Sequence, residues 1–378
     1  MTENKDTMLR VTSYEVLGQL PDIFTFDNGE ELKDPADWSR RRAEIYKTAV
    51  ELQYGTMPPD PEFLEVETLY TGKGTHSYKI TTGRRDCPVS FRMQLFLPET
   101  KEKCPVIVDG DMCFAYFTHN GYVKTVTDKN IAWAFFDRTE LAHDIRNEGR
   151  RQGQLYRAYP EYTFGALGAW AWGYSRCVDA LLLLGIIDEG KIVFTGHSRG
   201  GKTAMLAGVL DTRAAIVCPN DTNAGSCSCY RIHMSAINEN GEEKKSETLA
   251  DLYSRFGFWM GEGMEAYTER ENELPFDCHF LKAMVAPRTL FVSEAVHDIW
   301  GNPIGSWQTT KAAEELFEFL GAKDSLFWYF RDGKHMHSVE DLEMLVNLIE
   351  HKFRGGELSD KFFRRPFEEK ELIFKKRK

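Results

Sequence analysis

The 378-residue chain has neither an excess of positive charge nor a long apolar segment. Its 58 Asp and Glu residues outnumber its 47 Lys and Arg residues, which gives a net charge of −11. A surface of this sign repels phosphate backbones and anionic lipid, so we expect neither nucleic acid nor a membrane as a partner. The longest apolar run, at 181–187, is far shorter than the roughly 18 residues that cross a bilayer, and we predict the end of a core helix there.

The sequence also lacks a dense cysteine framework. Its eight cysteines are scattered, whereas small secreted scaffolds pack theirs closely. The start, MTENKDTMLRVTSYEVLG, has none of the basic stretch, apolar stretch and small-residue cleavage site of a secretory signal. These observations predict free thiols and a cytoplasmic location. The CSC at 227–229 stands without a matching His or Cys pair beside it, so we predict no metal site.

No repeat, low-complexity stretch or linker rich in Pro, Gly or Ser divides the chain. We therefore predict one catalytic domain, residues 61–355, between an N-terminal helical extension, 1–60, and a charged C-terminal tail, 356–378, that forms solvated surface. Within the extension, a helix is predicted at 35–54. Asp34 can accept hydrogen bonds from its first amides, and a glycine can end it.

The pattern of apolar residues predicts an α/β fold. Segments with alternating apolar and polar residues, at 63–71, 77–82 and 89–97, are typical of half-buried antiparallel strands. Beyond them, short apolar segments alternate with helical segments, as in a parallel sheet covered by helices on both faces. The expected parallel strands begin at residues 105, 131, 191, 214, 288 and 326, and the expected helices span about 164–184, 199–210, 247–258, 307–320 and 339–352.

The segment GHSRGGK at 196–202 carries the strongest indication of chemistry. A G-x-S-x-G sequence between a strand and a helix is typical of a nucleophile elbow, whose tight turn exposes the serine hydroxyl above the sheet. Serine alone is a weak nucleophile. It needs a histidine base and an acid that orients the base, in the α/β-hydrolase order Ser, acid, His. We therefore predict Ser198 as the nucleophile of an α/β-hydrolase fold.

Two histidines and two aspartates compete for the other roles. The segment DGKHMH at 332–337 follows the last predicted strand. There His335, two residues after the loop glycine, is the predicted base and His337 the alternative. Asp298, after the preceding strand, is the predicted acid, and Asp221, one strand earlier, is the alternative. Each aspartate stands at the carboxyl end of a strand, where α/β sheets place their ligands.

The oxyanion of the tetrahedral intermediate needs preorganised donors. The amide of Arg199 directly follows the nucleophile, and the Arg199 guanidinium could also reach the oxyanion. A second amide is expected from GDMC at 110–113, with Asp111 as the candidate. Lys202, one helical turn beyond Ser198, could meet a polar substrate or a buried acid. This chemistry requires no metal or organic cofactor.

Several segments resemble the glucuronoyl esterases, α/β-hydrolases that cleave the ester between glucuronic acid on xylan and lignin alcohols. GHSRGGK at 196–202 is similar to the family's GCSRxGK. PND at 219–221 stands where the family has PQE, LPFDCH at 274–279 resembles its LPFDxH, and DIW at 298–300 falls near its DWL. The helix at 35–54 also resembles related bacterial acetyl-xylan esterase-like proteins.

The resemblance implies a serine esterase that forms an acyl-enzyme on a glucuronoyl (4-O-methyl-glucuronoyl) ester, with Lys202 toward sugar hydroxyls and Trp300 as a sugar-stacking residue. Asp221 is one methylene shorter than the family's Glu, which favours Asp298 as the acid. His197 replaces the family's elbow cysteine, so the disulfide that many members form there cannot exist.

The expected partner is a small carbohydrate ester, and the oligomeric state is left open. One alternative function is an acetyl esterase acting on xylo-oligosaccharides. An alternative of another class is a non-catalytic binding protein with the same fold.

Overall fold

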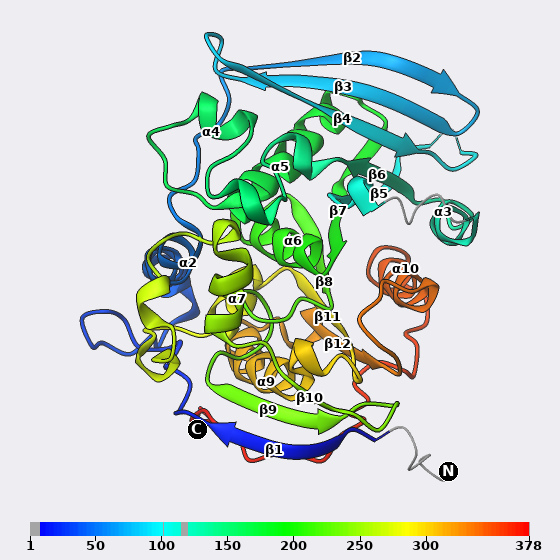
Figure 1. Ribbon diagram of the computed structural model, residues 1–378. Coiled ribbons are helices and arrows are strands. Elements are labelled where there is room, and N and C mark those ends of the chain that lie inside the picture. Colours follow the sequence, from blue (N-terminus) through cyan, green and yellow to red (C-terminus); the bar gives the residue numbers. More distant parts are fainter. Residues whose placement is uncertain (1–7, 101, 115–119, 378) are drawn as a thin grey trace.

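The computed structural model describes residues 8–100, 102–114 and 120–377, and its centre is one large sheet (Figure 1). Within the described residues the spatial order of this sheet is β12 (Leu326–Arg331), β11 (Thr289–Ala295), β8 (Ala214–Asn220), β7 (Ile187–His197), β5 (Cys104–Asp109), β6 (Ala132–Phe136), β4 (Pro88–Phe96), β3 (Thr75–Gly83) and β2 (Phe63–Gly72).

The sheet is parallel from β12 through β6, and it continues with antiparallel pairs from β6 through β4 and β3 to β2. The six parallel and three antiparallel strands predicted from the apolar segments are thus confirmed. The mostly parallel sheet of an α/β-hydrolase follows from them.

Helices cover both faces of the sheet, as predicted. The helices α5 (Ala166–Leu184), α6 (Arg199–Leu210), α8 (His279–Val285) and α9 (Pro303–Phe319) pack on one face, and α3 (Asn120–Thr127) and α10 (Val339–Arg354) pack on the other. Successive strand residues face opposite sides, so Val106 and Val108 join one apolar cluster and Ile107 joins the other. Among the described residues, no helix has the length and apolar character required to span a bilayer.

The N-terminal extension contains a strand as well as the predicted helix. β1 (Arg10–Val16) pairs with β9 (Ile232–Ile237), and β9 pairs with β10 (Glu243–Lys245), which makes a separate small sheet. The predicted helix is built from a 3₁₀ turn (Pro35–Asp37), α1 (Trp38–Ile45), a π-helical turn (Tyr46–Glu51) and α2 (Leu52–Tyr54). The Asp34 carboxylate accepts a hydrogen bond from the Ala36 amide at 2.9 Å, as expected of an N-cap.

The C-terminal segment differs from the solvated tail expected at 356–378. Phe362, Phe367 and Ile373 are buried, and the Leu20 amide donates to the Ile373 carbonyl at 2.7 Å. Burial of one such side chain contributes about 1.5–3 kcal/mol, while the charged side chains around it stay in water. The apolar residues spaced within the charge run therefore attach this segment to the domain.

Candidate active site

Ser198 lies in a tight turn between β7 and α6, with the φ angle of 58° that marks a strained non-glycine residue. The Ser198 amide donates to the Asn220 carbonyl at 2.9 Å, which fixes this turn against β8. A Cβ atom on Gly196 would lie 2.5 Å from the Gly200 carbonyl oxygen, so the turn requires glycine there. The local structure is that of the predicted nucleophile elbow.

His335 connects Ser198 to Asp298. Its Nε2 lies 2.9 Å from Ser198 Oγ, and its Nδ1 lies 2.7 Å from Asp298 Oδ2. A carboxylate only accepts, so Nδ1 carries the proton of the neutral ring and Nε2 presents a lone pair to the serine hydroxyl. The Asp298 side chain is 5% exposed, whereas that of His335 is 37% exposed. The histidine can thus meet both a buried carboxylate and an incoming substrate.

The alternative base and acid have other neighbours. The ring of His337 stacks on that of His197, with centroids 5.8 Å apart, and burial lowers the pKa of His337. Asp221 accepts hydrogen bonds from Arg331 Nη2 at 2.8 Å and from the Ala295 amide at 2.5 Å. The structure therefore brings His335 and Asp298 to Ser198, and it engages His337 and Asp221 elsewhere.

His197 fills the space beside the nucleophile. Its Nδ1 donates to Asn220 Oδ1 at 2.7 Å, and its ring centroid lies 4.7 Å from that of His335. Burial, followed by the neighbouring His335 and His337, lowers the pKa of His197 well below its ordinary value, so the ring stays neutral. All eight cysteines lie within the described residues and are free thiols.

Asp111 does not present its amide as an oxyanion donor. We expected this amide to face the substrate, but it donates to Asp109 Oδ1 at 2.8 Å. The buried Asp111 carboxylate pairs with Arg138 and accepts the His197 amide at 2.7 Å. Asp111 therefore supports the elbow from beneath, because its carboxylate satisfies a backbone donor next to the nucleophile.

Arg199 begins α6 directly after Ser198. Its guanidinium donates to Asp144 Oδ2 at 3.0 Å and lies 4.7 Å from the centroid of the Trp259 ring, whose Nε1 donates to the other Asp144 oxygen. The guanidinium is thus anchored beside the site, with 28% of the side chain exposed. The Arg199 amide belongs to the first turn of α6, where amides have no partner within the helix.

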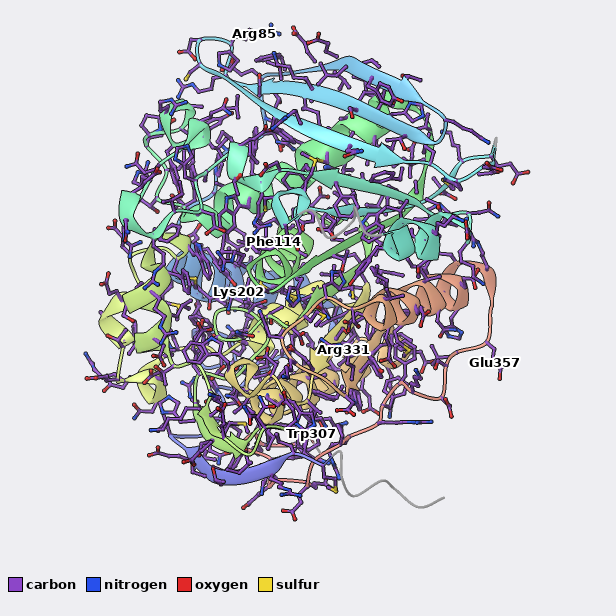
Figure 2. The ribbon with its side chains drawn as sticks, turned by 45° about the vertical axis from the view of Figure 1, so that its right-hand side comes forward. Arg85, Phe114, Lys202, Trp307, Arg331 and Glu357 are labelled. Carbon is purple, nitrogen blue, oxygen red and sulfur yellow. The ribbon has the colours of Figure 1, made fainter. Side chains whose placement is uncertain are left out.

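Lys202 and Trp300 meet at Glu247, a residue that sequence reasoning missed. The buried Lys202 donates to the Ala224 carbonyl and lies 3.5 Å from Glu247 Oε2, while a side-chain hydrogen bond links Glu247 to Trp300. Figure 2 shows Lys202 toward the middle of the molecule, whereas Arg85 lies at its periphery. Glu247 lies just before α7 (Leu249–Phe256) in a segment without a motif, so no sequence signal identified it.

A cavity of about 530 Å³ opens beside His335. Its walls come from three places: the hairpin that joins β9 to β10, the turn after β11 that holds Asp298 and Trp300, and the loop with Lys334 and His335. The lining residues of the hairpin and of β10 are all polar or charged, namely Asn238, Glu239, Asn240, Glu242, Glu243, Lys244 and Lys245. The cavity thus combines the Trp300 ring with several polar side chains that could orient a ligand.

Within the part of the chain that the structure describes, one group of side chains offers three possible metal ligands. Ligand atoms of Asp221, Asp298 and His335 lie within 4.8 Å of one another. Asp298 and His335 are hydrogen-bonded to each other, however, and Asp221 is paired with Arg331. A guanidinium cation in this position neutralises the charge that would attract an ion, so the group fits a hydrogen-bonded network better than a metal centre.

Comparisons with known proteins agree with the resemblance seen in the sequence. A family model described as "Glucuronyl esterase, fungi" matches residues 80–321. The 4-O-methyl-glucuronoyl methylesterase of Podospora anserina is 32% identical over 327 residues, which cover 85% of this chain and 64% of that protein. The enzyme of the same name from Cerrena unicolor is 30% identical, with 84% and 65% covered. The chain spans slightly under two thirds of the length of these relatives.

Solved structures give the same result for the fold. A glucuronoyl esterase of carbohydrate esterase family 15 from Caldicellulosiruptor kristjansonii superposes with a TM-score of 0.77 at 29% identity, covering 90% of this chain and 92% of that one. The glucuronoyl esterase catalytic domain from Hypocrea jecorina gives 0.75 at 25% identity, with 94% of each chain covered. By sequence and by fold, this chain belongs to the glucuronyl esterase family.

Proposed function

We propose that this protein is a serine carboxyl-ester hydrolase that cleaves glucuronoyl esters of carbohydrates, including 4-O-methyl-glucuronoyl esters. The observation that carries the proposal is the chain of hydrogen bonds from Asp298 through His335 to Ser198, located at the carboxyl ends of the parallel strands. Relatives that share most of this chain are named 4-O-methyl-glucuronoyl methylesterases, which supports the choice of ester.

The arrangement can perform acyl transfer in two steps. His335 Nε2 takes the Ser198 proton while Oγ attacks the ester carbonyl carbon, and Asp298 stabilises the imidazolium that forms. The tetrahedral intermediate collapses, the bond from the carbonyl carbon to the alcohol oxygen breaks, and the alcohol leaves with the proton from His335. His335 then takes a proton from a water molecule while the water oxygen attacks the acyl carbon. When the bond from this carbon to Oγ breaks, His335 returns the proton to Ser198.

The Arg199 amide is the proposed donor to the oxyanion. It follows the nucleophile at the amino end of α6, where the helix leaves its amides unpaired and adds a partial positive charge. The Arg199 guanidinium, held by Asp144 at 3.0 Å, is the proposed second source of positive charge. Both groups are preorganised, so they stabilise developing negative charge without moving.

The sugar ring is proposed to occupy the cavity beside His335. Trp300 lines this cavity, and the buried pair of Lys202 and Glu247 lies next to Trp300. Sugars combine apolar C–H faces with hydroxyl edges, so an aromatic ring beside a buried ion pair suits them. In this arrangement Trp300 contacts the sugar, and Lys202 and Glu247 support the wall of the site; none of the three takes part in bond cleavage.

The test measures acid release from a benzyl glucuronate ester and from an acetylated xylo-oligosaccharide, by wild type and Ser198→Ala. The expected result is hydrolysis of the glucuronate ester by the wild type and a loss of about 10⁶-fold in kcat in Ser198→Ala. Ser77→Ala, on the distant strand β3, is the matched serine control and should retain full activity.

Other outcomes would replace the proposal. Preferred release of acetate would point to an acetyl esterase. Absence of hydrolysis, or equal rates with and without Ser198, would point to a binding protein.

The cytoplasmic location remains a prediction. Eight free thiols suit a reducing compartment, and no disulfide is possible at His197. Fractionation of the producing cells, with detection of the protein in each fraction, tests it. Recovery from the culture medium or the periplasm would contradict it.

A further inference from the structure

We propose that Arg331 is a positioning residue whose buried guanidinium holds the loop that carries His335 and thereby sets the contact between His335 and Ser198. The inference rests on the proposed function, because it concerns the same base. Arg331 ends β12, and the loop of residues 332–337 follows it directly.

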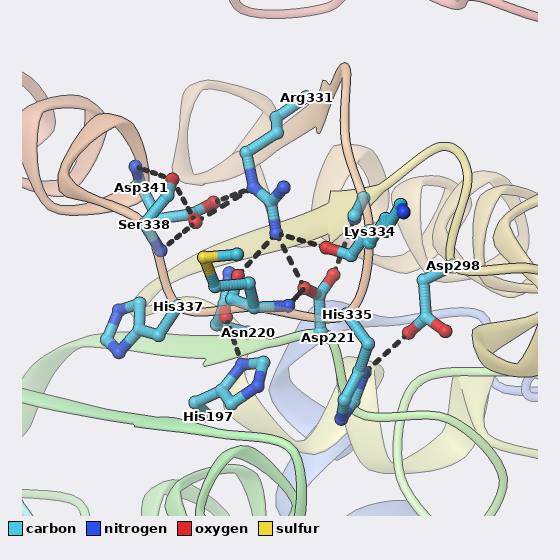
Figure 3. A network of polar contacts seen from close by, with 12 residues as sticks. His197, Asn220, Asp221, Asp298, Arg331, Lys334, His335, His337, Ser338 and Asp341 are labelled. Atoms are coloured by element: carbon cyan, nitrogen blue, oxygen red, sulfur yellow. Dashed lines mark hydrogen bonds and ion pairs between the residues drawn. The ribbon is translucent and has the colours of Figure 1, made fainter. Parts of the chain in front are cut away.

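The guanidinium joins three parts of the protein (Figure 3). Its side chain is 4% exposed. Nη2 donates to Asp221 Oδ2 at 2.8 Å, to the Lys334 carbonyl at 3.0 Å, and to the Met336 carbonyl. Nε donates to both oxygens of Asp341, at 2.9 and 3.1 Å. The partners therefore come from the end of β8, from the histidine loop and from the start of α10.

The loop is wrapped around this cation. Lys334 and Met336 are the chain neighbours of His335, so one nitrogen atom holds the backbone on both sides of the base. Gly333 has a φ of +139°, and a Cβ atom placed on it would lie 2.5 Å from Arg331 Nη1. The backbone thus passes directly over the guanidinium.

Two carboxylates compensate the buried charge, and each is held by further contacts. Asp341 accepts the amide and hydroxyl of Ser338, as the capping box that begins α10, and it also accepts the Ser293 hydroxyl at 3.0 Å. Asp221 accepts the Ala295 amide. The guanidinium is therefore bound to rigid elements on one side and to the histidine loop on the other.

The loop that carries Asp298 is attached to the same place. The Val296 amide donates to the Arg331 carbonyl at 2.9 Å, and the His297 amide donates to the Gly333 carbonyl at 3.1 Å. The position of Arg331 therefore determines the position of His335 and, through the backbone, the position of the Asp298 carboxylate that orients His335. Asp221, which sequence reasoning kept as the alternative acid, acts here as the counter-ion of the anchor.

The decisive variant is Arg331→Lys, which keeps the charge and loses the planar array of donors. An ammonium group cannot bond two carboxylates and two carbonyls in this geometry. We expect kcat on the glucuronate ester to fall about 10²-fold, the size of effect produced by a displacement of about 1 Å in a reacting group. KM should change less than kcat, by no more than about threefold, because Trp300, the proposed sugar-stacking ring, lies in a different loop.

Arg288→Lys is the matched control. The Arg288 guanidinium also donates to backbone carbonyls, those of Ala214 at 2.9 Å and Gly208 at 2.6 Å. Arg288 directly precedes β11, so it lies at the amino ends of the strands, whereas Ser198 lies at their carboxyl ends. Both variants should lower the Tm, and Arg288→Lys should retain kcat within about threefold. An equal loss of kcat in the two variants, or unchanged kcat in Arg331→Lys, would overturn the proposal.

A measurement without substrate separates this proposal from the proposed function. The proton between His335 Nδ1 and Asp298 should give a far-downfield proton NMR signal, identified by its loss in His335→Gln. The signal should disappear in Arg331→Lys and persist in Arg288→Lys and Ser198→Ala. With this result the positioning role holds even if the wild type hydrolyses neither ester. Persistence of the signal in Arg331→Lys would refute it.

A milder change serves if Arg331→Lys does not fold. Asp221→Asn leaves an oxygen acceptor for Arg331 and removes one counter-charge. We expect kcat to fall about tenfold with KM unchanged. An unchanged kcat in folded Asp221→Asn would count against Arg331 as the positioning residue.

Discussion

Lys202 Nζ lies 3.5 Å from Glu247 Oε2, and each side chain is 3% exposed. Burial raises the pKa of the Glu247 carboxyl, and the nearby Lys202 opposes that rise. Two charges removed from water in this way depend on each other, because each would be costly to bury alone. The pair therefore links the helix after the nucleophile to the wall of the proposed sugar site.

Removal of the charge of one partner should destabilise the fold more than replacement of both partners by apolar residues does. Glu247→Gln leaves the Lys202 ammonium without a counter-charge, and we expect a loss of about 3–5 kcal/mol in the free energy of unfolding. The double variant Lys202→Met, Glu247→Leu should lose less than Glu247→Gln alone. Urea denaturation of the wild type and both variants measures this. A loss in the double variant equal to or larger than that of Glu247→Gln would show that the ammonium does not depend on its counter-charge.

The two histidines of the last loop should differ sharply in their effect on activity. His335→Gln removes the base beside Ser198, and we expect kcat to fall by about 10⁴-fold or more. His337→Gln removes a ring that stacks on His197, so kcat should fall less than about tenfold. Steady-state hydrolysis of the glucuronate ester by both variants decides this. A greater loss in His337→Gln would contradict the assignment of the base.

The two aspartates should differ in the same way. Asp298→Asn leaves the size of the side chain unchanged but favours the wrong tautomer of His335, and we expect kcat to fall about 10⁴-fold. Asp221→Asn should lower kcat only about tenfold, because Asp221 reaches the base through Arg331. The kcat values of the two variants, compared at one pH, give the answer. The reverse order would show that Asp221 is the acid.

Glu294 should make the stability of the fold depend on pH. Burial raises the pKa of Glu294 from 4.5 to about 8, with Asp298 nearby adding to the rise. The folded protein therefore keeps a proton that the unfolded chain has already lost, so stability decreases as the pH rises from about 4.5 to 8. Below this window the stabilisation is fully present, and above it the loss is complete.

Glu294→Gln should remove this dependence, since an amide does not titrate in the window. Between pH 5 and pH 8 the wild type should lose about 2–4 kcal/mol more than the variant, at about 1.4 kcal/mol per unit. Urea denaturation at both pH values measures the difference. Parallel losses in the two proteins would show that Glu294 does not titrate as inferred.

Much of the fold could be predicted because the parallel strands are continuous apolar runs. The small sheet could not be predicted in the same way. β1 alternates apolar and polar residues, but its partner β9 lies beyond several helices, and no local pattern relates Arg10 to Ile237. The seven residues of α8 are also too few to show a helical period.

The site was predictable where local sequence determines geometry and unpredictable where distant side chains determine it. Ser198 could be identified because the elbow needs small residues at fixed positions. Asp221 is not the proposed acid because its carboxylate pairs with Arg331. This contact joins the ends of β8 and β12, which are far apart in the sequence, so local sequence does not reveal it. Asp111 was misplaced because the direction of its amide depends on Asp109, and a residue string does not show backbone orientation.

The pairing of β1 with β9 has a consequence for the order of events during synthesis. β1 ends at Val16 and β9 begins at Ile232, so β1 leaves the ribosome well before its partner has been made. Until then β1 has no hydrogen-bonding strand beside it in the small sheet, and long-range pairing of this kind forms late. The hairpin after β9 lines the cavity beside His335, so the residues of the elbow are synthesised before this wall of the pocket.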